Sequence, residues 1–399
     1  MTQFRIGFLP LVDAALPIIA HEMGLAQQQG VGITLVRDPS WATVRDRLIY
    51  GQTDAAHMLA PLAIATSLGL DRPAVPMVAP FMLGLNGNGI TITPAIAAQI
   101  ADETGVTEAG LAFAAIARQR RDAGKKLRLA VVHRFSSHNY MLRYWLAASG
   151  CNPDRDVEIV TVPPPFVTES LLAGEIDGSC VGEPWNSVAV ERGAGVIITT
   201  TSQIWSRGVE KLLAFRQSLV EERREEVEAL LRALHEAGKL IEQPDRIADI
   251  ASLLARSEYV DQPEELIARA LSNRLVRRRD EAPQKMNDYL VVHREAANFP
   301  WRSQAMWLYS QMIRWGHAPL DEAGFAAAAQ VFRPDIYRAA MVGTDAVIPA
   351  ASTKVEGAIE HPIGAGSVTG RLILGPDRFF DGMIFDPDEP LEYLRRTGM

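Results

Sequence analysis

Short apolar segments alternate with amphipathic stretches along the first part of the chain. Brief apolar runs bounded by turn residues predict strands, and they occur at Arg5–Pro10, Gly32–Arg37, Ala55–Leu59 and Val75–Ala79. Stretches with helical spacing of apolar residues separate them, at Pro17–Gln28 and Val44–Tyr50. This rhythm of strand, helix and strand is typical of a parallel sheet with helices on its faces.

The rhythm starts again after a predicted helix at about Thr107–Arg121. Further strands are predicted at Leu127–Val132, Glu158–Val162, Ser179–Gly182 and Gly195–Thr201, with a helix from about His138 to Ser149. A strand at Lys211–Phe215 then returns the chain to its first part. Two crossings of this kind are what a receptor that closes about a hinge requires.

We therefore expect an α/β protein of two lobes, which also suits a chain of 399 residues. Lobe 1 comprises residues 1–122 together with about 211–340, where the later segments form a helical extension. Lobe 2 comprises residues 123–210. Residues 341–399 are rich in Gly, Pro and Asp and predict an irregular C-terminal tail.

Composition and charge narrow the range of partners. The net charge of -8 argues against direct nucleic-acid binding, and the basic runs Arg118–Lys126 and Arg274–Arg279 are expected to be solvated helix faces. Apolar runs stay well below the ~20 residues of a membrane span, so we expect no membrane insertion. The chain begins at a predicted strand without a signal-peptide pattern, which predicts a cytoplasmic location.

Sequence motifs of several enzyme classes are missing. The chain has no phosphate-binding loop of the G-x-x-x-x-G-K-[ST] type and no G-x-S-x-G elbow. His21-Glu22 and His235-Glu236 lack the second histidine of H-E-x-x-H. Cys151 and Cys180 have no metal-like spacing and are expected to be two buried thiols. We therefore expect no enzyme activity, no cofactor and no metal.

Polar and aromatic clusters stand at the expected ends of elements, where ligands bind in open α/β sheets. They are PSWATVRDRL (39–48), LNGNGITI (85–92), SSHNYMLRYWLA (136–147), VPPPFV (162–167) and CVGEPWN (180–186). Together with DAAHMLAPL (54–62), these segments resemble the nitrate- and bicarbonate-binding proteins of ABC transporters, in the same order over roughly residues 3–340. The resemblance implies a two-lobed periplasmic-binding-protein-like fold of type II, each lobe a mostly parallel sheet flanked by helices.

The resemblance also implies a ligand site. The family's nitrate-contacting positions fall on Trp41, His138, Gly182 and Lys211. Where nitrate-transport proteins have Gln in an NGQ-type turn, this chain has the shorter Asn88. Bicarbonate-binding relatives have a carboxylate at the position of Lys211.

These residue types suit nitrate, a planar monoanion that only accepts hydrogen bonds. Its site is expected to contain donors only, with one positive charge to offset desolvation. Lys211 supplies the charge, His138 and Asn88 supply N–H groups, Trp41 an indole N–H or a flat wall, and Gly182 a backbone N–H. Bicarbonate has a hydroxyl that needs an acceptor, so this set favours nitrate or nitrite.

Three hypotheses follow from the resemblance. The first is a cytoplasmic nitrate/nitrite sensor of an assimilation operon, which holds an RNA-binding antiterminator inactive until the anion arrives. The second is the substrate-binding receptor of a nitrate ABC transporter. The third is an enzyme of the same fold, such as those of thiamine-pyrimidine synthesis, which use a site rich in cysteine and histidine that this chain does not obviously contain.

Overall fold

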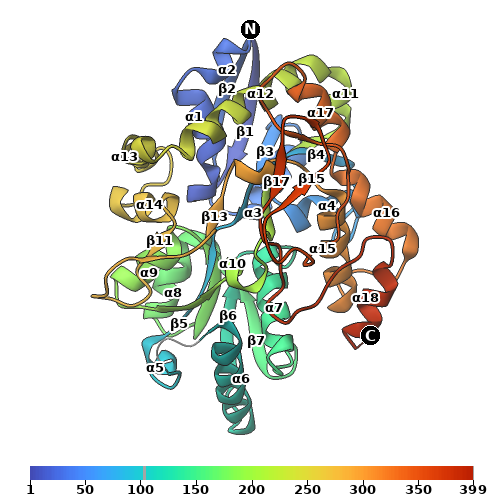
Figure 1. Cartoon of the computed structure of the whole chain (residues 1–399). Coiled ribbons are helices and arrows are strands. Elements are labelled where there is room, and N and C mark those ends of the chain that lie inside the picture. Colours follow the sequence, from blue (N-terminus) through green and yellow to red (C-terminus); the bar gives the residue numbers. More distant parts are fainter. Residues whose placement is uncertain (102–104, 399) are drawn as a thin grey trace.

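Two β-sheets, one in each lobe, organise the computed structural model, which describes residues 1–101 and 105–398 (Figure 1). The lobe 1 sheet has the order β13-β4-β10-β3-β1-β2. Its strands are β1 (Thr2–Phe8), β2 (Val31–Arg37), β3 (Ala55–Leu59), β4 (Met77–Asn86), β10 (Val209–Arg216) and β13 (Leu290–Val291). The lobe 2 sheet has the order β7-β6-β8-β5-β9. Its strands are β5 (Asn88–Ile92), β6 (Leu127–Val131), β7 (Val157–Thr161), β8 (Gly178–Gly182) and β9 (Val196–Thr200).

The two sheets share one topology. In lobe 1, β1 runs parallel to β2 and β3, and β10 lies antiparallel between β3 and β4. In lobe 2, β6 runs parallel to β7 and β8, and β5 lies antiparallel between β8 and β9. Each sheet is thus completed by a strand that crosses from the other lobe. This arrangement confirms the predicted two-lobed α/β fold of the periplasmic-binding-protein type.

The first crossing lies earlier in the chain than the predicted boundary after residue 122. β4 passes into β5 through Gly87, whose φ of 87° is a conformation that glycine adopts without strain. α5 (Pro94–Ala97) and α6 (Val106–Asp122) consequently pack in lobe 2, where α6 contacts β6 and β9. The segment Asn86–Gly89 interrupts the apolar pattern between β4 and β5, but a turn signal alone does not tell that the chain enters another sheet.

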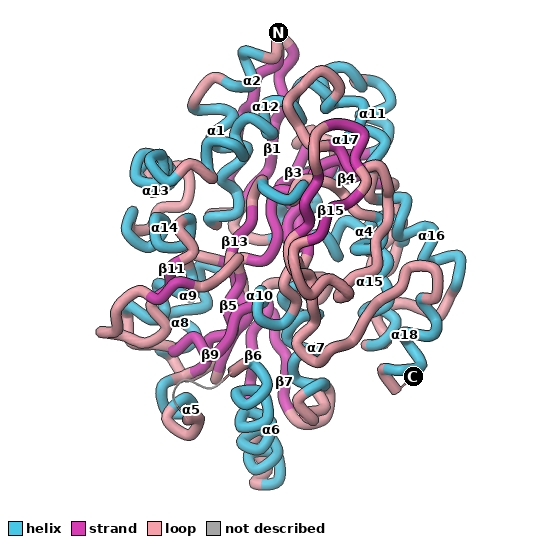
Figure 2. Tube along the Cα trace, viewed as in Figure 1, coloured by secondary structure: helices cyan, strands magenta, loops and turns pink. Residues whose placement is uncertain are grey.

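Helices cover both sheets, as Figure 2 shows. Those of lobe 1 up to β4 are α1 (Ala15–Glu22), α2 (Leu25–Gln28), α3 (Trp41–Ile49) and α4 (Ala60–Leu68). The remaining helices of lobe 2 are α7 (Ser137–Ala148), α8 (Val167–Leu172), α9 (Trp185–Glu191) and α10 (Thr201–Ile204). The helical extension contains α11 (Gln217–Glu222), α12 (Arg224–Ile241), α13 (Ile247–Leu254), α14 (Glu264–Leu271), α15 (Arg302–Arg314), α16 (Glu322–Val331) and α17 (Pro334–Met341). α12 packs against α1, α2 and α17.

The C-terminal tail is mostly irregular, as predicted, but it contains short strands and one helix. These are β14 (Ile348–Pro349), β15 (Ile363–Ala365), β16 (Ser367–Thr369), β17 (Leu372–Leu374) and α18 (Pro390–Arg396). The tail contacts lobe 2 as well as the extension of lobe 1. The Tyr144 hydroxyl of α7 donates to Asp381 at 2.8 Å, and the indole N–H of Trp205 donates to Asp377 at 2.6 Å.

Two observations complete the description of the fold. Cys151 and Cys180 are both buried and not joined by a disulfide, which confirms their prediction as buried thiols. Among the described residues, every helix is too short or too polar to cross a bilayer.

Candidate ligand-binding site

The five residues selected from the sequence lie together between the lobes, and all are buried. Lobe 1 contributes Trp41 and Lys211, and lobe 2 contributes Asn88, His138 and Gly182. Trp41 follows β2 and His138 follows β6, so both stand beyond the carboxyl ends of parallel strands. This is the edge at which open α/β sheets bind ligands.

Serine caps fix the two helices that carry Trp41 and His138. The Ser40 hydroxyl accepts a hydrogen bond from the Thr43 N–H, so that α3 begins at Trp41. The Ser136 hydroxyl accepts from the Asn139 N–H in the same way, so that His138 lies in the first turn of α7. The N-terminus of a helix carries partial positive charge, which favours an anion beside His138.

Asn88 and Gly182 are direct cross-strand partners in the ladder between β5 and β8. A Cβ atom at position 182 would lie 3.2 Å from Asn88 Oδ1 and 3.3 Å from Leu11 Cδ2. Both contacts are tighter than ordinary packing allows, so a side chain at 182 would push the Asn88 amide out of place. Glycine at this position therefore allows Asn88 and Leu11 to approach the β8 backbone closely.

Lys211 is fully buried and has two carboxylate partners that the sequence analysis did not name. Its Nζ lies 2.9 Å from Asp13 Oδ2 and 2.5 Å from Glu210 Oε1. It also lies 5.3 Å from the centre of the Trp41 ring, within the range of a cation–π contact. The prediction of a site made only of donors is therefore wrong, because two acceptors flank the cation.

An irregular stretch of β10 brings Glu210 and Lys211 to the same place. Consecutive side chains of a regular strand point to opposite faces of the sheet. The register between β10 and β4 shifts on both sides of Lys211, which is the signature of a β-bulge or similar irregularity. The two side chains can therefore meet, and simple alternation would have placed Glu210 on the far side of the sheet.

Two histidines extend the charged cluster. His57 of β3 lies with its Nε2 2.9 Å from Asp13 Oδ1, and its ring centre lies 5.2 Å from that of Trp41. His138 Nδ1 lies 3.4 Å from Glu210 Oε1 but forms no hydrogen bond with it. The chain of contacts thus runs from His57 through Asp13, Lys211 and Glu210 to His138, across the lobe interface.

Burial and charge act in opposite directions on the pKa values of these groups. Burial alone would raise the pKa of the Asp13 and Glu210 carboxyls, but Lys211 outweighs it and lowers both. Burial alone would lower the pKa of Lys211, but Asp13 and Glu210 outweigh it and raise it. Burial lowers the pKa of His57, and it lowers the pKa of His138 to about 4. Near neutral pH the cluster thus contains one cation, two anions and two neutral imidazoles.

Several buried polar atoms around Lys211 have no hydrogen-bond partner among the described residues. They are both amide atoms of the Asn88 side chain, both ring nitrogens of His138, Nδ1 of His57 and Nε1 of Trp41. A buried polar group without a partner costs about 1–3 kcal/mol, and native proteins contain few of them. Their gathering around one buried cation indicates that a ligand with several acceptor atoms belongs between them.

Three residues of the charged cluster were not predicted individually from the sequence: Asp13, His57 and Glu210. His57 is the one ionisable side chain of β3 (Ala55–Leu59), which is otherwise apolar. An ionisable side chain that is fully buried in a strand needs a partner, and this signal was available for His57. Glu210 gave no such signal, because its position depends on the irregularity of β10.

Cys180 bears on the hypothesis of an enzyme that uses a cysteine. It lies in β8, two residues before Gly182, and burial raises the pKa of its thiol far above the usual range. A thiol that stays protonated is a poor nucleophile. The geometry therefore gives no support to cysteine chemistry at this site.

Comparison with known families and proteins places this geometry in context. The model of the NMT1-like family matches residues 1–255. The nitrate/nitrite binding protein NrtA of Synechococcus elongatus is 30% identical over 399 residues, which cover 98% of this chain and 84% of that protein. The nitrate import ATP-binding protein NrtC of Synechocystis sp. PCC 6803 is 31% identical over 395 residues, and the chain spans about half of its length, 54%.

The structural comparison agrees. The crystal structure of the periplasmic nitrate-binding protein NrtA from Synechocystis PCC 6803 superposes with a TM-score of 0.87. The match covers 100% of this chain and 99% of that one, at 26% sequence identity. A bicarbonate transport ATP-binding protein, CmpC of Synechococcus elongatus, is also related, with 29% identity over 401 residues and 54% of its length covered.

Proposed function

Since this chain belongs to the NMT1-like family of substrate-binding proteins, we propose that it is a non-enzymatic receptor for a small planar oxyanion, nitrate or nitrite. The observation that carries this proposal is the group of unpartnered polar atoms around buried Lys211. It is supported by the NrtA relatives, whose names state nitrate/nitrite binding.

The proposed role of each residue follows from its position. Lys211 supplies the positive charge, His138 and Asn88 donate N–H groups from lobe 2, and the Trp41 indole N–H completes the set from lobe 1. An oxyanion with three acceptor atoms matches donors that approach from different elements. Because the donors come from both lobes, the bound anion would hold the lobes together.

The two carboxylates raise the question of bicarbonate, whose hydroxyl needs an acceptor. Asp13 and Glu210 are already engaged, Asp13 with Lys211 and His57 and Glu210 with Lys211. With both imidazoles neutral, the unpartnered donors are the Asn88 amide, the Trp41 indole N–H and one ring N–H of His138, and the oxygens of an anion that only accepts can bond to all of them. This balance favours nitrate or nitrite, with bicarbonate as the competitor to exclude.

Isothermal titration calorimetry tests the ligand class. We expect saturable heats with sodium nitrate or sodium nitrite and none with sulfate or phosphate, because larger dianions exceed one cation and a small site. Matching ionic strength with sodium chloride removes nonspecific effects. Saturable binding of bicarbonate without a response to nitrate or nitrite would overturn the proposal.

For the biological role, the relatives favour a transport receptor. The NrtA and NrtC relatives are named for nitrate binding and nitrate import, and we propose that this chain delivers the anion to a membrane permease. Co-purification with a permease and an ATPase, strengthened by nitrate, would support that role. Failure to recover a permease with the chain, both with and without nitrate, would contradict this role.

The sensor role is a second proposal, in which a cytoplasmic chain binds an RNA-binding antiterminator. One observation favours it: the tail contacts both lobes, through Asp381 at Tyr144 of lobe 2 and Glu356 at Ser303 of the lobe 1 extension, so lobe closure would change the tail surface. If nitrate favours a form that binds the antiterminator poorly, the antiterminator must weaken nitrate binding by the same factor.

Size-exclusion chromatography with the purified antiterminator separates the two roles. The sensor proposal expects a complex that nitrate dissolves, and it expects Trp41→Ala to retain the complex at high nitrate. A complex that ignores nitrate, or no complex, would contradict the sensor role and leave the transport receptor.

A further inference from the structure

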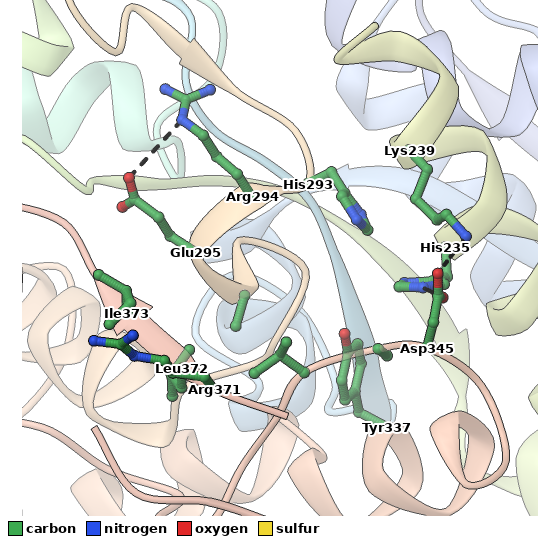
Figure 3. Close-up of a pocket in the computed structure, with 13 residues that line it drawn as sticks. His235, Lys239, His293, Arg294, Glu295, Tyr337, Asp345, Arg371, Leu372 and Ile373 are labelled. Atoms are coloured by element: carbon green, nitrogen blue, oxygen red, sulfur yellow. Dashed lines mark hydrogen bonds and ion pairs between the residues drawn. The ribbon is translucent and has the colours of Figure 1, made fainter. Parts of the chain in front are cut away.

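A second cluster of ligand-type side chains lines a cavity in lobe 1, outside the lobe interface. The cavity has a volume of about 370 Å³ and lies between α12, the chain around β13, α17 and the tail. Figure 3 shows His235, Lys239 and Asp345 gathered on one side of it, with His293 close by. None of these residues belongs to the interlobe site.

The side of the cavity formed by His235 and Asp345 already holds a cation, the Lys239 ammonium. His235 Nε2 lies 3.0 Å from Asp345 Oδ1, and Lys239 Nζ lies 2.6 Å from Asp345 Oδ2. The same ammonium lies 3.2 Å from Glu236 Oε2. One ligand atom from each of His235, Glu236 and Asp345 lies within 4.8 Å of the others. Two carboxylates and an imidazole therefore converge on a point that a positive charge occupies.

The histidines supply the independent observation. His235 is only 3% exposed, and its Nδ1 is buried without a hydrogen-bond partner among the described residues. Nδ1 of His293 is also buried without a hydrogen-bond partner among the described residues. The ring centres of His235 and His293 lie 4.8 Å apart. A packing role would be expected to satisfy these nitrogens through protein or water. His235 would coordinate through Nε2, the nitrogen that faces Asp345, and His293 brings a second imidazole close to the first.

We propose that His235, Glu236 and Asp345 bind a divalent metal ion of the zinc class, with His293 as the adjacent fourth donor. Mixed nitrogen and oxygen ligands favour zinc and its transition-metal neighbours over calcium and magnesium, which prefer oxygen alone. Tetrahedral ligands about 2.0–2.1 Å from zinc lie about 3.3 Å apart, close to the 3.0 Å between His235 and Asp345, whereas the set with Glu236 extends to 4.8 Å, so the Glu236 side chain must move inward on binding.

Metal binding would require Lys239 to move, because its ammonium contacts both Glu236 and Asp345. Its side chain is 32% exposed and sits on a flexible stem, so the ammonium can move into solvent when the metal arrives. The metal would join α12 to the segment that follows α17, because Asp345 lies on that segment. No metal was expected from the sequence, because His235-Glu236 lacks the second histidine of H-E-x-x-H and the two cysteines have no metal-like spacing. Asp345 lies more than a hundred positions away, so no local motif joins it to His235.

The test is titration of the chelator-treated full chain with zinc chloride, followed by calorimetry and thermal unfolding. We expect one equivalent of zinc to bind and to raise the unfolding temperature by mass action. Asp345→Asn changes a side chain that is 62% exposed, so it should keep the fold and weaken zinc binding at least ~10–100-fold. His235→Ala should have a comparable or larger effect.

Lys239→Ala gives the sharper result, because it should tighten zinc binding by removing the competing ammonium. His361→Ala, at an exposed histidine, and His138→Ala, in the interlobe site, are the matched controls and should leave zinc binding unchanged. Zinc binding that survives Asp345→Asn, that disappears in His138→Ala, or that is absent from the wild-type chain would overturn the proposal.

Discussion

Two lysines of this protein, Lys211, which is fully buried, and Lys354, whose side chain is 13% exposed, have similar charged partners and different surroundings. Lys211 at the lobe interface contacts Asp13 and Glu210, and Lys354 in the tail contacts Glu356 and Asp377. Each cluster therefore contains one ammonium and two carboxylates withdrawn from water. The charges alone give no reason to assign a ligand to one cluster and a structural role to the other.

The neighbouring polar groups distinguish them. In the tail, the Ser303 hydroxyl donates to Glu356 at 2.6 Å, and the Trp205 indole N–H donates to Asp377 at 2.6 Å. Burial and nearby Asp377 raise the pKa of Glu356 to about 8, against the effect of Lys354, so the tail cluster keeps a proton at neutral pH. Both carboxylates of the tail cluster thus have hydrogen-bond donors besides Lys354, and its charge is balanced without a ligand.

At the lobe interface, both features differ. Both carboxylates next to Lys211 have lowered pKa values, and His138, Asn88 and Trp41 present buried polar atoms without partners. Leaving such groups unpaired is costly, so this region is complete only with a ligand. Incomplete hydrogen bonding, rather than buried charge, is the reason for proposing a ligand at the lobe interface and not in the tail.

The largest expected effect comes from removing each lysine. Lys354→Met and Lys211→Met both leave two carboxylates near one another in a buried environment, and loss of one partner of a buried ion pair costs about 3–5 kcal/mol. Urea unfolding should show a loss of this size in both variants. Calorimetry should show that only Lys211→Met loses nitrate binding.

Equal nitrate affinities in the two lysine variants, measured below their unfolding transitions, would contradict the distinction between the clusters. Circular dichroism before each titration is the control for folding.

The next effect concerns the uncharged neighbours. His138→Ala and Asn88→Ala remove donors that have no protein partner, so the free energy of unfolding should change little while nitrate affinity falls. A hydrogen bond to a charged group contributes about 1.5–3 kcal/mol, which corresponds to about a 10–150-fold weaker Kd. Calorimetry with nitrate measures this loss.

Ser303→Ala is the matched variant in the tail cluster. It removes a satisfied hydrogen bond to Glu356, so we expect a lower free energy of unfolding and an unchanged Kd for nitrate. A loss of nitrate affinity in Ser303→Ala, together with unchanged affinity in His138→Ala and Asn88→Ala, would contradict the distinction between the two clusters.

Acidification provides a smaller, directional effect. The pKa of His138 is lowered to about 4, chiefly by burial, and a bound anion would favour the protonated imidazole and raise that pKa. The anion should therefore bind with uptake of a proton, and nitrate affinity should increase as pH falls from 7 toward 4, by at most about tenfold per pH unit for one proton.

His138→Gln, which cannot titrate, is the control for this effect and should flatten the pH dependence. Nitrate affinity in the wild-type chain that is constant, or that decreases, as the pH falls from 7 to 4 would contradict the placement of His138 next to the anion.

The smallest effect is expected at Trp41. Trp41→Phe keeps an aromatic ring near Lys211 and removes only the unpartnered indole N–H. One neutral hydrogen bond contributes about 0.5–1.5 kcal/mol, so nitrate affinity should fall about two- to tenfold with little change in stability. A change larger than that caused by His138→Ala would show that Trp41 acts chiefly through packing.

The sequence predicted most strands of both lobes and five residues that meet between them, but it predicted neither β5 nor the second half of β4. Apolar runs bounded by turns are a local signal, which explains why β3, predicted as Ala55–Leu59, was correct to the residue. The change of sheet at Gly87 was not predicted, because register depends on partners that are distant in sequence. Glu210 escaped for a related reason, since its meeting with Lys211 requires the irregular ladder of β10.

The most direct test of the central claim is a nitrate titration of the wild-type chain and of His138→Ala at pH 6, with bicarbonate and chloride titrated in parallel. The account predicts that nitrate saturates the wild-type protein, that His138→Ala binds it at least tenfold more weakly at unchanged stability, and that bicarbonate competes poorly. Saturation by bicarbonate alone, or nitrate binding that is indifferent to His138→Ala, would contradict it.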